Sequence, residues 1–297
     1  MKTLEQGVGP ESQERQGRVL LHFFRHGEQF KDPEKRDQDY ELSPAGRGQA
    51  MKKAEETKDT RNLRQSMAFG SPRKRAQQTA AFAMTGAGAD SITGNESFDE
   101  LRAKIDKDIK YGSKVAADPR LNFFMDKNTP FGAKAMEAFT NKRYIEFLVN
   151  ESDALAREVG DENGSTYSRQ AGSIADVVLK YAKVSPRWQE LVSDATKKYE
   201  ETLERFLGSH QGVSECFLAK VIEKTEGSAE RDRFVEAIKK QGFDFTEGFD
   251  VELVSQNGSE PQVRIRYKKE GAEGKGFEFD RTVPLSVVEE ISAEQKG

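Results

Sequence analysis

Short apolar runs that end abruptly in polar residues alternate along this chain with longer stretches in which apolar residues recur at helical spacing. The run 18–24 (RVLLHFF) is almost continuously apolar and rich in β-branched and aromatic residues, which favours a buried central strand of a parallel sheet. Residues 66–70 and 205–209 are shorter candidate strands. We therefore predict three strands at these positions, each followed by a polar segment.

Two Ser-Pro pairs mark predicted helix starts. Serine is a good N-cap, and proline fits the first helical position because its missing N–H is not needed there. Ser43-Pro44 predicts a helix from 44 to about 57, and Ser71-Pro72 predicts a helix through about 84. The resulting order of strand, helix, strand and helix is typical of an α/β sandwich.

The middle of the chain, residues 101–202, has mainly helical periodicity and contains no convincing strand. Because it lies between the second and the last predicted strand, we interpret it as a helical insertion or cap. Its helices are predicted at 131–149, 165–184 and 186–203, and two more follow at about 213–224 and 229–241.

Near the C-terminus the pattern changes to that of strands. The dipeptide Asn257-Gly258 predicts a tight turn between the first two of them. The predicted strands are 251–254, 263–267 and 277–279, and a short helix is predicted near 287–291.

These elements predict an α/β fold: a three-layer α/β/α sandwich with a mostly parallel sheet, a helical insertion and a C-terminal β-rich extension over 250–281. We expect one domain over 18–297, preceded by a flexible tail over 1–17. No apolar run of 18 residues is present, so we expect a cytoplasmic protein.

Composition narrows the possible partners and cofactors. The formal net charge is −4, which gives no electrostatic case for nucleic acid or an anionic membrane as a partner. The single cysteine, Cys216, excludes an intrachain disulfide and lies in an apolar run typical of a core. The three histidines lack metal-ligand spacing, so we expect no metal and no other cofactor.

Polar residues that carry chemistry follow three of the predicted strands. Arg25-His26-Gly27 follows the first, Arg75 lies just inside the helix after the second, and His210 follows the strand 205–209. Ligands of open α/β sheets bind outside the carboxyl ends of the strands, so these residues are expected to meet at one edge. His22 lies within the first strand, where core packing is expected.

This set of side chains suits phosphoryl transfer. A neutral imidazole can attack phosphorus and hold the phosphoryl group covalently. Arginines bind phosphate oxygens through two hydrogen bonds and remain charged, and a second imidazole can stabilise the transferred oxygens. Gly27 allows the backbone to turn tightly next to the phosphate. No metal is required by this chemistry.

Four segments resemble, in order, the motifs of the histidine phosphatase (phosphoglycerate mutase-like) superfamily. They are Arg25-His26-Gly27, the segment 42–50 (LSPAGRGQA), the segment 71–80 (SPRKRAQQTA) and Ser209-His210-Gln211-Gly212. The resemblance implies a phosphohistidine on His26, phosphate contacts from Arg25, Arg75 and His210, and an acidic proton donor. Substrate contacts are also expected from Gly27, Glu28 and Gln211, whereas Arg73 and Lys74 are expected to be solvated.

The proton donor is the least determined of these residues. In the mutase-like branch of the family it follows the strand after the helix of the second arginine. Glu100 lies at a similar spacing from Arg75 and is the first candidate. The local pattern of the family is not reproduced, so Asp99, Glu96 and Asp106 remain open.

The resulting hypothesis is a cytoplasmic, metal-independent phosphatase that acts on a small phosphorylated substrate or a phosphoprotein. A mutase would return the phosphoryl group to another hydroxyl; the residues after Gly27, Glu28-Gln29-Phe30, differ from those of that branch. A third possibility is a scaffold protein that binds a phosphorylated ligand with little turnover. The insertion 101–202 is expected to shape the substrate pocket.

Overall fold

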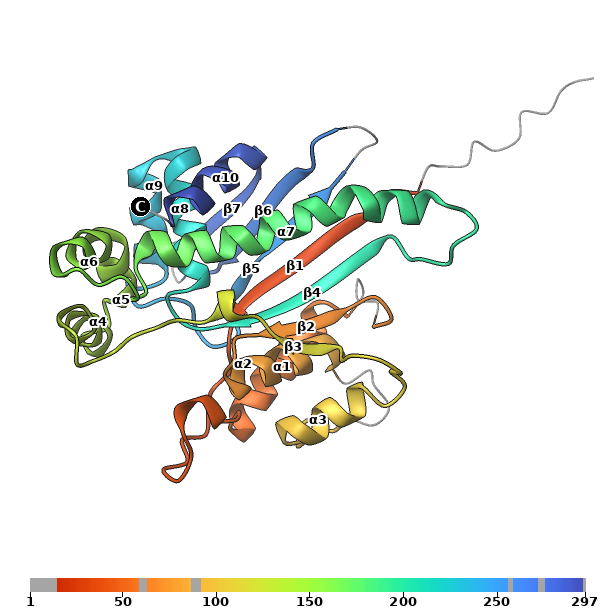
Figure 1. The fold of residues 1–297 in the computed structure, drawn as a ribbon, viewed down its shortest axis with the longest axis horizontal. Helices are drawn as coiled ribbons and strands as arrows, with labels where there is room; N and C mark the ends of the chain where they lie inside the picture. The colour runs from red at the N-terminus through yellow and green to blue at the C-terminus, as the bar shows by residue number, and fades with distance from the viewer. Residues whose placement is uncertain (1–14, 59–62, 87–91, 256–258, 272–275, 296–297) are drawn as a thin grey trace, which may run out of the picture.

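The computed structural model describes residues 15–58, 63–86, 92–255, 259–271 and 276–295. Within these residues seven strands form one sheet with the order β3-β2-β4-β1-β5-β6-β7 (Figure 1). The strands are β1 (Arg18–Arg25), β2 (Met67–Gly70), β3 (Val115–Ala117), β4 (Thr202–Ser209), β5 (Gly248–Val254), β6 (Gln262–Lys269) and β7 (Phe277–Val283).

The sheet has a parallel half and an antiparallel half that meet at β1. Strands β3, β2, β4 and β1 run parallel to one another, as predicted for the core of the fold. Strand β5 pairs with β1 in the antiparallel direction, and β6 and β7 continue that half. The predicted C-terminal β-rich extension is therefore part of the same sheet.

Helices cover the sheet as the predicted three-layer arrangement requires. The β1 side chains Val19, Leu21 and Phe23 belong to the larger core cluster with α7 and α8, while Phe24 belongs to a second cluster with α1 and α2. The first layer contains α7 (Tyr167–Ser193), α8 (Ser214–Glu226), α9 (Ser228–Ala237) and α10 (Leu285–Glu294), and the other contains α1 (Pro44–Glu56), α2 (Lys74–Thr85) and α3 (Phe98–Ile105) (Figure 1).

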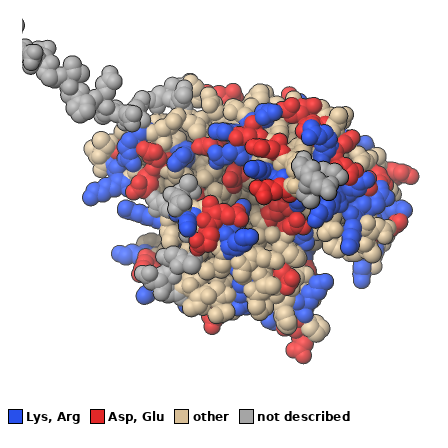
Figure 2. Space-filling model, turned by 180° about the vertical axis from the view of Figure 1, so that it is seen from behind, with Lys and Arg blue, Asp and Glu red and all other residues tan. Residues whose placement is uncertain are grey.

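The antiparallel half buries one face and leaves the other to solvent. Along β5 and β6 buried and more exposed residues alternate, which is the period of a strand covered on one side. The outer face carries ion pairs from Arg264 to Asp280 and from Arg266 to Glu252. Acidic and basic side chains are mixed over the surface seen in Figure 2, rather than separated by sign.

The helices predicted for residues 101–202 lie in different parts of the molecule. Helix α3 packs on α2, α7 packs on β1 and β5, and the remaining helices group at one end of the sheet (Figure 1). The stretch also contains β3, where we predicted no strand. Strand β3 has three residues and pairs only with β2, so it is too short to show the alternation of apolar and polar residues that predicts a strand. The grouped helices are α4 (Pro130–Thr140), α5 (Tyr144–Phe147), the π-turn η4 (Leu148–Ser152) and α6 (Asp153–Val159).

The predicted helix break before Pro186 is wrong, because α7 continues through this residue. A proline inside a helix costs about 3 kcal/mol through a lost hydrogen bond and a clash with the preceding turn. Tyr181 and Ala182 before the proline and Trp188 after it are all buried, so packing on both sides offsets that cost. The helix ends at Ser193, and Thr202 and Leu203 belong to β4 instead.

The remaining predictions concern the cysteine, the C-terminal turn, the N-terminal tail and membrane spans. Cys216 is fully buried, as predicted for a core residue. The turn at Asn257-Gly258 and most of the predicted tail lie outside the described residues. Among the described helices, none combines the length and the apolar character that a membrane span needs.

Candidate active site

The two histidine segments meet because their strands are neighbours in register. Arg25, at the end of β1, pairs with Ser209, at the end of β4, so His26 and His210 leave adjacent strands at the same edge of the sheet. Their rings lie edge to face with centroids 5.0 Å apart. The predicted convergence of the two histidines is therefore present.

Gly27 is required by the close approach of a neighbouring turn. A Cβ atom at this position would lie 2.6 Å from the carbonyl oxygen of Gly46, which is closer than Cβ atoms approach other heavy atoms in proteins. The Gly27 N–H donates to the hydroxyl of Thr79 at 3.1 Å. The first turn of α1 and the middle of α2 thus fix the backbone that carries His26.

His26 is held in one tautomer. Its Nδ1 lies 2.6 Å from the carbonyl oxygen of Gly27, which can only accept, so Nδ1 carries the proton and Nε2 carries the lone pair. Burial, and after it the nearby Arg75 guanidinium, lowers the pKa of His26 to about 3. The ring is consequently neutral at physiological pH, which is the form of imidazole that acts as a nucleophile.

Arg75 contacts that lone pair directly. Its Nε lies 3.3 Å from His26 Nε2, and its Nη1 donates to the backbone carbonyl of Asp37 at 2.7 Å. Burial lowers the pKa of Arg75 to about 10, so the guanidinium remains charged at neutral pH. Arg75 projects from the first turn of α2, which brings it over the ends of β1 and β4.

Arg25 also lines the pocket and keeps part of its guanidinium unpaired. Its Nη1 donates to the carbonyl of Phe243 at 2.6 Å, and the guanidinium stacks 4.4 Å above the ring of Phe245. Its Nε is buried and has no partner among the described residues. A buried donor of this kind favours an anionic ligand.

His210 pairs with the segment that follows β2. Its Nε2 lies 2.6 Å from the hydroxyl of Ser71, and its buried Nδ1 has no partner among the described residues. Burial, with His26 and the arginines, lowers the pKa of His210, so this ring is neutral as well. The predicted cap at Ser71 is therefore wrong: α2 begins at Lys74 with Arg73 as its N-cap, and the Ser71 hydroxyl faces His210.

These side chains line a pocket of about 670 Å³. A pocket of this size can hold a small organic ligand. Its lining residues come from β1 and the segment after it, from α2, from the segment 123–144, and from the loops after β4 and before β5. They are Arg25, His26, Glu28, Gln29, Lys31, Asp37, Tyr40, Arg75, Phe123, Met125, Met136, Phe139, Tyr144, His210, Gln211 and Phe245.

Glu28 and Gln211 line the pocket as predicted for substrate contacts, but each also has a structural partner. The Glu28 carboxylate accepts from the hydroxyl of Ser43 at 2.7 Å, next to the N-terminus of α1. The Gln211 amide donates to the backbone carbonyl of Gln241. Each side chain therefore borders the pocket and also hydrogen-bonds to another segment of the chain.

Glu100 does not line this pocket. Its exposed carboxylate accepts from the backbone N–H and the hydroxyl of Ser97, which completes a capping box at the start of α3. Asp99 pairs with Lys74, while Lys104 and the turn 93–94 bind Glu96 and lower its pKa to about 2. Asp106 accepts from the backbone of Lys114. None of the four predicted proton donors lines the pocket beside His26, because each carboxylate binds a partner within or next to α3.

Asp37 and Arg73 lie next to Arg75, although neither of them was assigned to the site from the sequence. The carboxylate of Asp37, in the 3₁₀ turn η1 (Asp37–Asp39), forms ion pairs with both Arg73 and Arg75. Arg73 also stacks 4.3 Å above Phe123 and donates to Asn122, so the prediction that it is solvated is wrong. The one sequence signal for a role of Arg73 at the site is that it lies two residues before Arg75.

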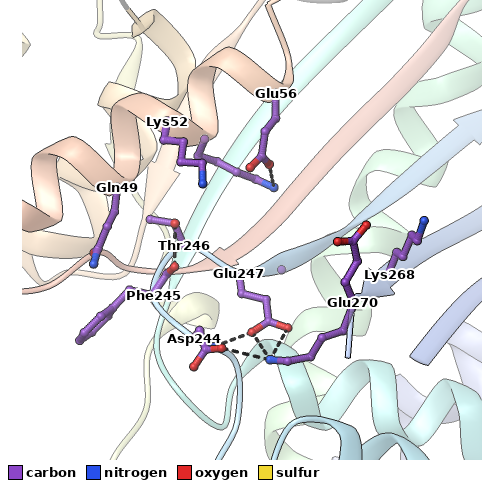
Figure 3. A pocket seen from close by; sticks show the side chains of 12 residues that line it. Gln49, Lys52, Glu56, Asp244, Phe245, Thr246, Glu247, Lys268 and Glu270 are labelled. Carbon is purple, nitrogen blue, oxygen red and sulfur yellow. Dashed lines mark hydrogen bonds and ion pairs between the residues drawn. The ribbon is translucent and has the colours of Figure 1, made fainter. Parts of the chain in front are cut away.

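A second hollow, of about 470 Å³, lies between α1 and the neighbouring ends of β5 and β6 (Figure 3). There Lys269 pairs with Asp244 and Glu247. Phe245 lines both this hollow and the histidine pocket. Neither of the paired histidines lines the second hollow, so the chemistry described above belongs to the first.

Comparison with known families agrees with the motifs. Residues 21–130 match the family model described as the histidine phosphatase superfamily (branch 1). Over these residues, a little more than a third of its length, the chain resembles the histidine phosphatase superfamily. The match includes His26 and Arg75, whereas His210 lies beyond it. Among the described residues, no cluster of three or more His, Cys, Asp or Glu side chains could hold a metal ion.

Several solved structures are similar to the chain at low identity. A mycobacterial glucosyl-3-phosphoglycerate phosphatase has 18% identity and a TM-score of 0.43, covering 82% of this chain and 92% of its own. A phosphoglycerate mutase from Bacillus anthracis has 15% identity and a TM-score of 0.44, covering 96% and 99%. A phosphoserine phosphatase from Entamoeba histolytica has 18% and 0.40, covering 82% and 94%. No curated protein matches the chain.

Proposed function

We propose that this protein hydrolyses a small phosphomonoester through a phosphohistidine on His26. The observation that carries the proposal is the state of the His26 ring: Nδ1 is bound to Gly27, and the Nε2 lone pair lies against Arg75 within the pocket. A neutral imidazole beside permanent positive charge can attack an anionic ester, because the arginines offset the repulsion of that ester.

The proposed reaction has two steps. In the first, the His26 Nε2 lone pair forms a bond to phosphorus, the ester P–O bond breaks, and the leaving oxygen takes a proton from a carboxylic acid. In the second, water attacks phosphorus, the N–P bond breaks and inorganic phosphate leaves, while the proton of the water returns to the carboxylate. Arg25, Arg75 and His210 bind the phosphoryl oxygens in both steps.

We propose Asp37 as the proton donor in place of Glu100. Of the carboxylates on described residues, Glu28 and Asp37 line the pocket, and Asp37 contacts the guanidinium that also touches His26. A phosphate bound to Arg75 would compete with Asp37 for the donors of this guanidinium, while the pair of Asp37 with Arg73 could remain. To act as a general acid, this carboxyl group must carry a proton when the ester is bound.

The assignment of Asp37 can be tested by its dependence on the leaving group. Asp37→Asn should slow hydrolysis of an alkyl phosphate by roughly 10²-fold, but slow p-nitrophenyl phosphate much less, because p-nitrophenolate leaves without a proton. Asp39→Asn is the matched control, since Asp39 lies in the same turn and pairs with Arg36 instead. Equal effects of Asp37→Asn on both substrates would remove it from proton transfer.

We also propose that the reaction needs no metal, since Arg25 and Arg75 can supply the positive charge that a metal ion gives in other phosphatases. Turnover should survive dialysis against EDTA. Loss of turnover that Mg²⁺ or Zn²⁺ restores would contradict this part of the proposal.

The products distinguish a phosphatase from the two alternatives. With a purified alkyl phosphate, we expect equal amounts of alcohol and inorganic phosphate from the wild-type chain and neither from His26→Ala. Transfer of the phosphoryl group to a second hydroxyl without phosphate release would indicate a mutase. Saturable binding of the ester without either product would indicate a binding protein.

A further inference from the structure

The residues that line the histidine pocket differ in chemistry according to the segment that supplies them. The segment after β1 contributes polar side chains that include Glu28, Lys31 and Asp37. The apolar lining residues come largely from within the predicted insertion. They are Phe123, Met125, Met136, Phe139, Tyr144 and Phe245, together called the apolar wall below.

The apolar wall begins at the groups that would hold the phosphate. The ring of Phe123 lies 5.1 Å from that of His210, edge to face. The ring of Phe245 lies 6.1 Å from that of His26 and beneath the Arg25 guanidinium. The group esterified to a phosphate bound there would meet hydrocarbon within its first few atoms.

The outer part of the wall remains open to solvent. Met136 is 41% exposed and Phe139 is 46% exposed, although both line the pocket. When a ligand covers large apolar side chains at the mouth of a pocket, apolar surface is removed from water, and this stabilises the complex. This exposure favours an apolar group in contact with α4.

The charges of the pocket give little support to a second anion on the substrate. Arg25 and Arg75 lie at the phosphate position, and Arg73 is engaged by Asp37, Asn122 and the face of Phe123. Lys31 is the remaining cation among the described lining residues, and the carboxylates Glu28 and Asp37 line the pocket with it. A carboxylate or second phosphate on the substrate would therefore meet acidic side chains or hydrocarbon.

From these observations we propose that the substrate is the phosphomonoester of an apolar alcohol or phenol large enough to cover the apolar wall. This inference rests on the proposed phosphatase activity and specifies its substrate class. The pocket volume of about 670 Å³ can accommodate a phosphate together with an aromatic ring or a branched alkyl group.

The test uses three esters of primary alcohols, so that their leaving groups are closely matched: 3-phenylpropyl phosphate, propyl phosphate and the phosphate ester of 3-hydroxypropanoate. We expect kcat/KM to be roughly 10- to 100-fold higher for the phenylpropyl ester than for the propyl ester, because a phenyl ring buries apolar surface on the wall. The carboxylate ester should be the poorest substrate.

Variants then locate the preference. Phe139→Ala should lower the ratio of kcat/KM between the phenylpropyl and propyl esters to within a few-fold of 1. Phe124→Ala is the matched control, because Phe124 is 53% exposed, precedes Met125 and does not line the pocket. This control should leave the ratio unchanged.

The outcomes separate this inference from the proposed function. His26-dependent hydrolysis of all three esters with similar kcat/KM, or a preference for the carboxylate ester, would overturn the apolar-substrate inference and leave the phosphatase intact. Absence of His26-dependent hydrolysis of every ester would overturn the proposed function and this inference together.

Discussion

His22 and His26 lie four residues apart, one in β1 and one directly after it, and both are buried, yet their environments drive them to opposite charge states. Burial lowers the pKa of both rings. Around His22 the carboxylates of Asp250 and Glu204, 2.7 Å and 2.9 Å away, reverse this and raise the pKa to about 9. Around His26 arginines add to the effect of burial, and the pKa falls to about 3.

The comparison shows that the neighbours of a buried histidine, rather than burial alone, decide its role. In the middle of the sheet the charged His22 ring on β1 binds carboxylates on the neighbouring strands β4 and β5. The hydroxyl of Ser66 donates a further hydrogen bond to Glu204. At the carboxyl end of the strand a neutral ring faces positive charge, which suits a nucleophile for an anion. The first is a structural cluster, and the second is the candidate catalytic group.

The largest effect on stability is expected from His22→Leu. The substitution leaves Glu204 fully buried without its counter-charge, while Asp250 keeps some contact with solvent. The free energy of unfolding, measured by urea denaturation at pH 6, should fall by about 3–5 kcal/mol. The kcat of the fraction that remains folded should be unchanged.

A triple variant provides the control for His22→Leu. Adding Glu204→Gln and Asp250→Asn removes the unpaired charges, so part of the lost stability should return. If His22→Leu alone is as stable as the wild type, the buried ring does not carry the charge that we assign to it.

The two rings should also affect stability in different pH ranges. Because the folded pKa of His22 is raised, its contribution is present below about 6.5 and is lost as pH rises through about 9. Because the folded pKa of His26 is lowered, the unfolded chain alone binds that proton between about 6.5 and 3, and stability falls as pH falls. His22→Leu should therefore flatten the alkaline limb only.

NMR of histidine-labelled protein measures the same quantities directly. The chain contains three histidines, and none should titrate near pH 6.5. His22 stays protonated until pH approaches 9, and His26 stays neutral until pH falls toward about 3. The pKa of His210 is likewise lowered well below its usual value by burial. A ring of His26 that titrates with a pKa of 6 to 7 in the ligand-free protein would contradict the environment described here.

The smallest effect is expected from a carboxylate outside both histidine clusters. Glu100→Gln should leave the kcat for an alkyl phosphate within about 2-fold of the wild type, since its carboxylate caps α3 away from the pocket. Loss of the charged cap should reduce the free energy of unfolding only slightly, because the carboxylate is exposed. A 10²-fold drop in kcat would restore Glu100 as the proton donor and displace Asp37.

The parts of the site that the sequence predicted are those that strand order determines. His26 and His210 follow parallel neighbouring strands, and Arg75 enters from the helix after β2, so their meeting follows from topology together with the motifs. Such features are encoded locally or by the order of the strands.

The parts that the sequence did not predict depend on contacts between distant segments. Asp37 lies in a charged loop, and nothing in that loop shows that it reaches Arg73 and Arg75. Likewise, α7 continues through Pro186 because of burial supplied by other elements, and β3 exists only through its pairing with β2. In each case tertiary packing outweighs the local signal.

The central claim is that His26 forms a covalent bond to phosphorus while His22 does not take part. Rapid mixing with ³²P-labelled ester, followed by an alkaline quench, should trap a base-stable, acid-labile phosphoryl group that peptide mapping places on His26. The label should appear within the first turnover, persist in His22→Leu and disappear in His26→Ala together with turnover. Full turnover by His26→Ala, or label on any other residue, would contradict the account.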